Sequence, residues 1–161
     1  MMLHKPNLAQ LIYVAERLTD DEAREHEALG FGDYDPEEMA MRCNTQRGNA
    51  YVFLDKAGLP YYAVGFTLAN PGVAIAWSLS TDDCAKHIMD MTRGVKKLIK
   101  GVLQGGVHRV QMSCLESRTA ARRWFKALGA QHEATLRMMG RNGESVVVYS
   151  ITKDSRQCAV S

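Results

Sequence analysis

A long run of helical spacing between two β-rich segments constrains the fold of this chain more than any other feature of its sequence. Apolar side chains recur every three or four residues in this run, at Ile88, Met91, Val95, Leu98, Ile99 and Val102. This spacing puts them on one face of a helix, and Gly105-Gly106 supplies a stop. The sequence therefore predicts one long amphipathic helix from Asp82 to Gln104.

Shorter elements are predicted on both sides of this helix. The other predicted helices cover residues 8–18, 20–29, 36–43 and 118–128. The predicted strands cover residues 51–54, 61–68, 73–80, 107–115, 131–139 and 144–152. Asn142-Gly143 between the last two runs is typical of a hairpin turn. This order of helices and strands predicts an α/β fold.

Length and composition indicate a single packed domain. The chain has 161 residues, of which 46% are hydrophobic and 24% charged, a balance typical of globular proteins. No apolar run approaches the roughly 20 residues that cross a bilayer, and the N-terminus lacks the pattern of a signal peptide. We expect no membrane span and synthesis in the cytoplasm, with one domain over residues 1–153 and a polar C-terminal tail over 154–161.

Cysteine spacing argues against a disulfide framework or a structural metal site. The four cysteines are scattered and form no CxxC pair, at Cys43, Cys84, Cys114 and Cys158. We therefore predict reduced thiols. Cys84 and His87 are spaced to share one metal ion, but no second pair of ligands accompanies them, so no metal is predicted.

Residues 116–130 carry a family resemblance. They read ESRTAARRWFKALGA and follow directly after a predicted strand. Together with the order of the elements, this segment resembles the C-terminal half of the GNAT-family N-acyltransferases, whose signature there reads N-x-x-A-x-x-x-Y-x-x-x-G-[FA]. The resemblance implies an α+β domain with a mixed, mostly antiparallel sheet flanked by helices. In an active member it also implies acetyl-CoA as the cofactor.

Several short motifs resemble, more narrowly, the GNAT-like internal virion proteins of short-tailed phages. They are EALGF at 27–31 before PEE at 36–38, WSLSTD at 77–82, RWFKALGA at 123–130 and SITK at 150–153. This resemblance implies a protein made in the host cytoplasm and carried in the virion. It also implies binding to other virion proteins, with contact to DNA or to further copies of the chain as additional expectations.

The segment that corresponds to the family's phosphate-binding turn departs from the family pattern. In the family, a Q/R-x-x-G-x-G/A turn exposes backbone amides to the pyrophosphate of the cofactor. Here the corresponding cofactor-binding candidates are Thr81, Asp82, Asp83, Cys84 and Ala85. The segment holds no glycine, and its two carboxylates repel a dianion. Arg118, which replaces the family's helix-start asparagine, is a further candidate.

The family's proton donor is also altered. Phe125 stands where the family usually has a tyrosine that protonates the departing thiolate, and a phenyl ring has no proton to give. Tyr149 or Cys114 can replace it as the acid, and Glu116 or Asp82 can serve as the base. The alternative is that Tyr149 and Cys114 are ordinary strand residues.

Two sets of basic residues suggest contact with phosphates. The first set shares one face of the long helix and consists of Arg93, Lys96, Lys97 and Lys100. The second lies on the later helix and consists of Arg118, Arg122, Arg123 and Lys126. Such stripes can bind nucleic-acid phosphates, but the net charge of +2 is too small to predict this alone. A solvated helix face is the alternative.

The sequence thus predicts a non-catalytic GNAT-like phage protein that binds other virion proteins and needs no cofactor. The altered turn and the missing tyrosine are the reasons for excluding catalysis. The alternative is a divergent acetyl-CoA-dependent N-acetyltransferase that modifies a host protein or a small amine. Binding of acetyl-CoA distinguishes the two hypotheses.

Overall fold

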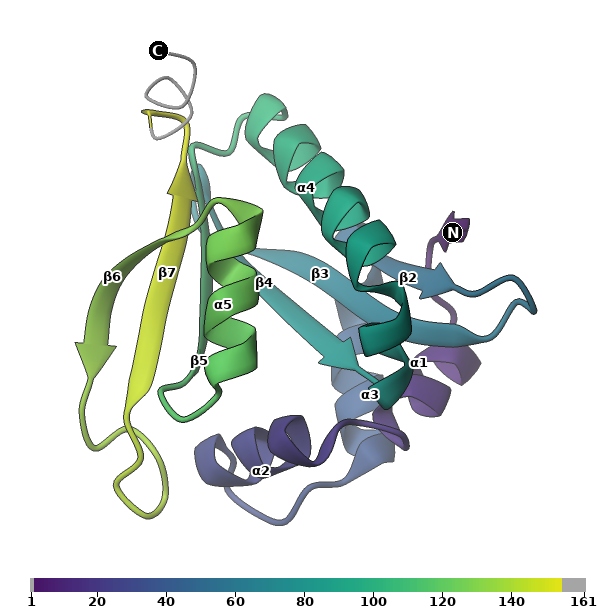
Figure 1. The fold of residues 1–161 in the computed structure, drawn as a ribbon, viewed down its shortest axis with the longest axis horizontal. Helices are drawn as coiled ribbons and strands as arrows, with labels where there is room; N and C mark the ends of the chain where they lie inside the picture. The colour runs from purple at the N-terminus through teal and green to yellow at the C-terminus, as the bar shows by residue number, and fades with distance from the viewer. Residues whose placement is uncertain (1, 155–161) are drawn as a thin grey trace. The chain divides into compact units, whose positions relative to one another are not determined.

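The computed structural model describes residues 2–154 and contains a seven-stranded sheet (Figure 1). Its strands are β1 (Met2–His4), β2 (Ala50–Leu54), β3 (Pro60–Asn70), β4 (Val73–Ser80), β5 (Arg109–Leu115), β6 (Gln131–Leu136) and β7 (Val146–Thr152). The strand order is β1-β2-β3-β4-β5-β7-β6. Strands β4 and β5 pair in parallel, whereas β1–β2, β2–β3, β5–β7 and β6–β7 are antiparallel. The mixed, mostly antiparallel sheet is therefore confirmed.

Five α-helices and two short 3₁₀ helices accompany the sheet in the described part of the chain. They are α1 (Leu8–Ala15), α2 (Asp20–Leu29), α3 (Pro36–Thr45), η1 (Arg47–Asn49), η2 (Asp82–His87), α4 (Ile88–Gln104) and α5 (Thr119–Leu128). No helix among residues 2–154 combines the length and apolar character that crossing a bilayer requires. The chain divides into unit 1, Met1–Thr67 with Trp77–Met91, and unit 2, Leu68–Ala76 with Thr92–Ser161.

Unit 1 is built on α1 and α3, which pack on buried residues of β3 and β4. Leu11 and Val14 of α1 are fully buried in this core. The indole ring of Trp77 lies against the backbone of Gly65, where an added Cβ would come within 2.2 Å of the ring. A side chain at this position would push the tryptophan away, so the close packing requires glycine.

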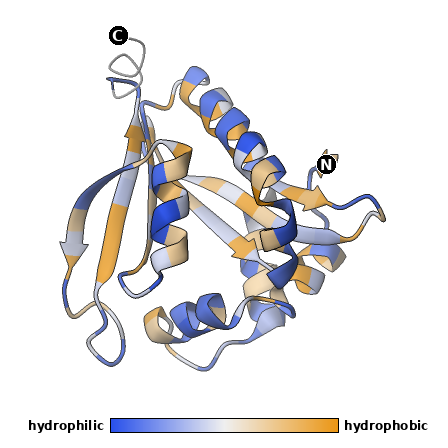
Figure 2. Cartoon of the chain, in the orientation of Figure 1, coloured by the Kyte–Doolittle hydropathy of each residue, from blue (hydrophilic) through white to orange (hydrophobic). Residues whose placement is uncertain are grey.

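Unit 2 packs α5 on the paired strands β5 and β7. The alternation of each strand directs one set of buried side chains to the same face, because Val110, Met112 and Cys114 lie opposite Ile151, Tyr149 and Val147. Apolar stripes run along α4 and α5, with hydrophilic residues on their other sides (Figure 2). The Trp124 indole nitrogen of α5 donates a hydrogen bond to the Thr92 hydroxyl of α4 over 2.9 Å.

The predicted helix starts follow local capping chemistry. The Thr19 side chain accepts a hydrogen bond from the Glu22 amide at the start of α2. Asp35 caps α3 by accepting from the Glu38 amide, and Pro36 occupies the first turn. These ends depend on residues close in sequence, which explains why they were predictable.

Two predicted helices differ from their observed bounds by three residues or more, and those of 36–43 and 118–128 differ by one or two. The first, predicted to Leu18, ends at Ala15, because Leu18 forms an isolated β-bridge with Thr81. The predicted helix over 82–104 is wrong in its first six residues, which form the 3₁₀ helix η2. The Tyr61 carbonyl of β3 holds this segment, since it accepts hydrogen bonds from the side chains of Thr81 and Cys84.

Other differences concern strands. The short strand β1 was not predicted, and it pairs with β2 from Met2 to His4. The closing hairpin of β6 and β7 is confirmed, but β6 ends at Leu136 and β7 begins at Val146. The turn between them closes through a 2.9 Å hydrogen bond from the Gly143 amide to the Gly140 carbonyl, and Gly143 has a φ of 82°. The division into residues 1–153 and 154–161 stays a prediction, and residues 155–161 lie outside the described part.

Candidate functional site

Three of the four predicted catalytic candidates interact with one arginine of unit 2. The nearby Tyr149 of β7 raises the pKa of the Arg122 guanidinium of α5, and the charges of Glu116 and Cys114 act in the same direction. One Arg122 nitrogen, Nη1, also donates to the Glu116 carbonyl over 3.1 Å. We call Arg122, Tyr149, Glu116 and Cys114 the Arg122 cluster. The sequence alone did not predict that these residues meet.

Tyr149 places a phenol next to the phenylalanine that replaces the expected tyrosine. Its ring contacts the Phe125 ring edge-on, with 5.5 Å between centroids, and the His132 ring at 5.3 Å. Only 1% of Tyr149 is exposed, so its phenol lies in surroundings of low dielectric constant, where polar interactions are stronger than in water. The contact between the Tyr149 and Phe125 rings follows from the position of each residue in its element, since β7 and α5 direct both rings to the same face of the sheet.

The Arg122 cluster contains the groups needed for proton transfer. A phenol can give up a proton, and a nearby guanidinium stabilises negative charge on an oxygen. Glu116 lies in the exposed loop between β5 and α5, so its carboxylate can accept a proton from a molecule in solvent. Cys114 is 1% exposed and lies beneath the helix as part of the core.

The segment from Thr81 to His87, in unit 1, is arranged differently from a phosphate cradle. Thr81 and Cys84 are buried, and both side chains donate to the Tyr61 carbonyl over 3.0 Å. Burial also raises the pKa of Cys84 to about 12, which keeps the thiol neutral at physiological pH. These two candidates hold the segment on β3, so their side chains are not available to a ligand.

The remaining residues of this segment carry negative charge. Asp82, Asp83 and Ala85 are exposed. A hydrogen bond from Lys86, whose Nζ lies 2.6 Å from the carboxylate, lowers the pKa of Asp83 and keeps it ionised. Carboxylates repel a pyrophosphate at short range, and no glycine here allows close approach of the backbone. The side chains of this segment therefore do not fit the phosphate end of acetyl-CoA.

The structure also places the predicted basic residues. Arg93, Lys96, Lys97 and Lys100 are exposed on α4, as predicted. Arg118 is the N-cap residue of α5 and is half-buried, and its amide donates to the Leu115 carbonyl over 3.0 Å. Arg122 is half-buried, and its Nη1 donates to the Glu116 carbonyl over 3.1 Å, so it is less open to solvent than Arg123 and Lys126.

No group of three or more metal-ligating side chains is placed to hold an ion within residues 2–154. The imidazole of His87 stacks instead on the Tyr61 ring, with centroids 4.4 Å apart. Cys43, Cys84 and Cys114 are buried and form no disulfide within the described residues, and Cys158 lies outside them. That the four thiols are reduced stays a prediction.

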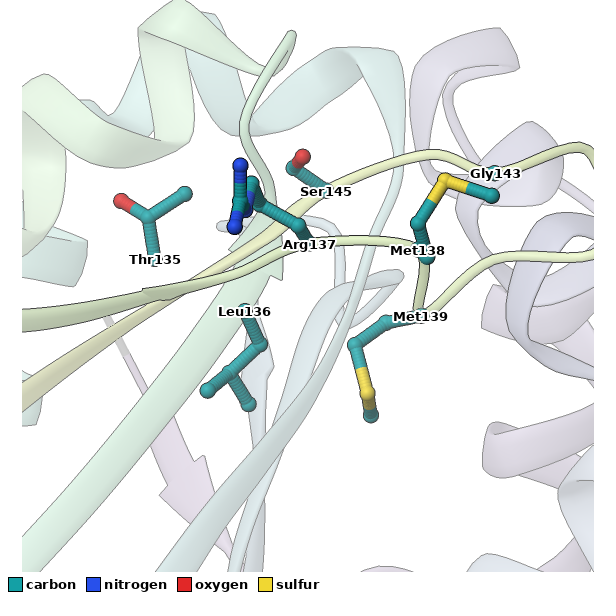
Figure 3. A pocket seen from close by; sticks show the side chains of 7 residues that line it. All are labelled: Thr135, Leu136, Arg137, Met138, Met139, Gly143 and Ser145. Atoms are coloured by element: carbon teal, nitrogen blue, oxygen red, sulfur yellow. The ribbon is translucent and has the colours of Figure 1, made fainter.

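A hollow of about 690 Å³ lies at the β6–β7 hairpin in unit 2 (Figure 3). Its lining includes the exposed apolar side chains of Leu136, Met138 and Met139 and the cation of Arg137. Figure 3 shows the Met138 sulfur beside Gly143. None of the predicted catalytic or cofactor-binding residues lines this hollow.

Comparison with solved structures identifies the fold. A ribosomal-protein-alanine N-acetyltransferase from Brucella melitensis superposes with a TM-score of 0.76 at 12% identity, covering 94% of this chain and 99% of that one. An N-acetyltransferase from Staphylococcus aureus superposes with a TM-score of 0.75 at 14% identity, covering 94% and 97%. A GNAT-superfamily phosphinothricin acetyltransferase from Sinorhizobium meliloti, solved in complex with acetyl-CoA, has a TM-score of 0.73 at 15% identity, covering 94% and 87%.

This chain therefore has the fold of the GNAT acetyltransferases along nearly its whole length. No family model matches the sequence, and no curated protein matches it in sequence either. Identities this low show the fold alone. The descriptions of these three structures name acetyltransferases and no virion protein.

Proposed function

We propose that this chain is a divergent N-acyltransferase that transfers an acyl group from an acyl-CoA to an amine. The observation that carries the proposal is the contact of the Tyr149 ring with the Phe125 ring, with 5.5 Å between centroids, in a fold shared with acetyltransferases. Tyr149 of β7 is therefore the candidate for the hydroxyl that is missing from α5. The acceptor amine would belong to a host protein or to a small molecule.

The Arg122 cluster would serve the two proton movements of acyl transfer. Acetyl-CoA, when bound, supplies the acyl group as a thioester. The acceptor amine must lose a proton, and the exposed carboxylate of Glu116 can take it. Tyr149 is the candidate that would give a proton to the departing CoA thiolate, and Arg122 would be the positioning residue beside it. Because the side chains of Thr81–His87 do not fit the phosphates, we expect acetyl-CoA to bind more weakly than in enzymes with the family turn.

Titration of the full chain with acetyl-CoA, followed by calorimetry and thermal unfolding, tests the proposal. We expect a binding isotherm and a rise in Tm with ligand concentration. Loss of a general acid typically costs about 10²- to 10⁴-fold in rate, so Tyr149→Phe should lower kcat by this range while acetyl-CoA affinity stays unchanged. Full activity in this variant would contradict the assignment of Tyr149, and no binding at millimolar acetyl-CoA would contradict the enzymatic proposal.

Two further variants separate positioning from folding. Arg122→Lys keeps a cation but loses the planar fork, whereas Arg122→Gln loses the charge. We expect kcat to fall in both, more in Arg122→Gln, and the pH profile of kcat to move. Phe125→Tyr restores the family's hydroxyl on α5, and we expect it to rescue part of the activity of Tyr149→Phe. A double variant no more active than Tyr149→Phe would argue against this arrangement.

A second candidate is a non-catalytic GNAT-like phage protein that is made in the host cytoplasm and binds other virion proteins. The observation that favours it is the segment Thr81–His87, whose buried side chains are used to hold β3 and whose exposed ones are acidic. Mass spectrometry of purified virions, combined with the acetyl-CoA titration, separates the candidates. Presence in the particle without acetyl-CoA binding would favour this second function, and absence from the particle would remove it.

A further inference from the structure

The net charge of +2 conceals a strong separation of charge between the two units. Counted from the sequence, unit 1 contains 14 acidic and 7 basic residues, a net charge of −7. Unit 2 contains 4 acidic and 13 basic residues, a net charge of +9. The two values add to the +2 of the whole chain. The net charge of the whole chain therefore describes neither unit, because unit 1 is acidic and unit 2 is strongly basic.

The positive charge of unit 2 is concentrated on two helices. Neither α5 nor the part of α4 from Thr92 to Gln104 contains an acidic residue. Their exposed basic side chains, which we call the basic surface, are Arg93, Lys96, Lys97, Lys100, Arg123 and Lys126. The hydrogen bond between Trp124 and Thr92 holds the two helices together within the same unit. Hydrophilic residues follow the outer sides of both helices (Figure 2).

We propose that the basic surface binds the phosphodiester backbone of a nucleic acid. The acids of unit 1 are partly neutralised within their own helices, since Asp21 pairs with Arg24, and Glu38 with Arg42. Most of the basic surface is not neutralised in this way. Five of its members form no ion pair within residues 2–154, namely Lys96, Lys97, Lys100, Arg123 and Lys126. Their positive charge remains available to a polyanion.

The spacing on α4 suits a row of phosphates. Arg93 and Lys100 are seven residues apart, which corresponds to about 10 Å along a helix. Duplex DNA carries one charge per roughly 1.7 Å of its axis, so this length of duplex presents about six phosphates. Three or four simultaneous contacts are therefore within reach of α4 alone. Phosphate contacts carry no base information, so we expect binding without sequence preference.

A membrane surface fits these helices less well than a nucleic acid does. Helices that lie in a bilayer interface bury an apolar face among the lipids. Within residues 92–130, all of which the structure describes, no large apolar side chain is exposed, and Val95, Ile99 and Leu103 of α4 are buried in the protein. The exposed sides of α4 and α5 thus carry positive charge but no large apolar side chain that could insert into a bilayer. This composition is typical of a phosphate-binding surface.

Fluorescence anisotropy with a labelled 20-base-pair DNA duplex tests this proposal, with single-stranded RNA of equal length as a second probe. Four phosphate contacts give a slope of log K against log salt near −3.6, so we expect affinity to fall roughly 100-fold between 50 and 200 mM salt. Binding of either probe supports the phosphodiester assignment, and their ratio identifies the preferred nucleic acid. Binding that is indifferent to salt, or absent at 50 mM salt, would overturn it.

Matched charge variants locate the surface. Lys97→Gln combined with Lys100→Gln should weaken binding and reduce the salt slope by about 2, because each lysine neutralises one phosphate. The control, Arg24→Gln with Lys56→Gln, removes the same charge from exposed positions of unit 1 and should leave the slope unchanged. Equal weakening in both double variants would refute the assignment to α4.

Two other partners would be recognised in the same experiment. Salt-sensitive self-association without DNA binding would show that the acidic unit of a second copy occupies the surface, which would overturn the proposal. Tighter binding to vesicles of anionic phospholipid than to DNA would overturn it as well. The inference is independent of the acyltransferase proposal, because neither DNA affinity nor its salt slope depends on acetyl-CoA binding or on Tyr149.

Discussion

The ion pair between Glu133 and Arg109 gives a pH-dependent prediction for the stability of unit 2. Glu133 lies at the point where the register of β6 and β7 shifts. Its two carboxylate oxygens lie 2.8 and 2.5 Å from the two terminal nitrogens of Arg109, and the Ser150 hydroxyl donates to one of them over 2.7 Å. These hydrogen bonds, the one from Arg109 first, lower the pKa of Glu133 from 4.5 to about 2.

This shift can be converted into an expected contribution to stability. A difference of about 2.5 pH units corresponds to roughly 3.4 kcal/mol. The Glu133 side chain is 38% exposed, so solvent screening reduces the figure, and we expect about 1 to 1.5 kcal/mol. Because the folded-state pKa is lowered, the contribution is present above the unfolded pKa near 4.5. It is lost as the pH falls towards 2.

Urea unfolding of Glu133→Gln and of the natural chain, at pH 7 and pH 3, measures this contribution. At pH 7 we expect the variant to be less stable by about 1 to 1.5 kcal/mol, and at pH 3 by less than half of that. Glu27→Gln, at an exposed position of α2, is the control and should show no such dependence. A Glu133→Gln deficit that is the same at both pH values would refute the electrostatic reasoning.

Three further predictions concern packing, capping and thiol chemistry. Gly65→Ala places a Cβ within 2.2 Å of the Trp77 ring, so we expect a loss of about 1 to 3 kcal/mol in urea unfolding and a changed tryptophan fluorescence. Unchanged stability would contradict the close approach of the ring. Asn7→Ala removes the side chain that accepts from the Gln10 amide at the start of α1 and should cost about 1 kcal/mol, whereas Asn7→Ser should restore most of it. Burial raises the pKa of Cys43 and Cys84 to about 12, so both thiols should resist alkylation in the folded protein and react only after unfolding. Rapid labelling of either thiol under native conditions would show that it is accessible.

The elements of this fold could be predicted because their signals are local. The apolar period of α4, the threonine cap of α2 and the proline at the start of α3 each act within a few residues of chain. The closing hairpin followed from Asn142-Gly143 in the same way. Such patterns determine which segments are helices or strands, since hydrogen bonding and side-chain periodicity in these elements depend on near neighbours.

The candidate site depended on contacts between distant parts of the chain. Tyr149 contacts Phe125 only because β7 pairs with β5 in a register that turns its ring towards α5. A contact between distant residues also explains η2. The Tyr61 carbonyl accepts hydrogen bonds from the side chains of Thr81 and Cys84, and the first six residues of the predicted long helix form a 3₁₀ helix there. The sequence by itself determined the elements, their caps and the whole-chain charge. Only the tertiary structure decided which side chains share a face and that acidic and basic residues gather in different units, because both depend on strand pairing across many residues.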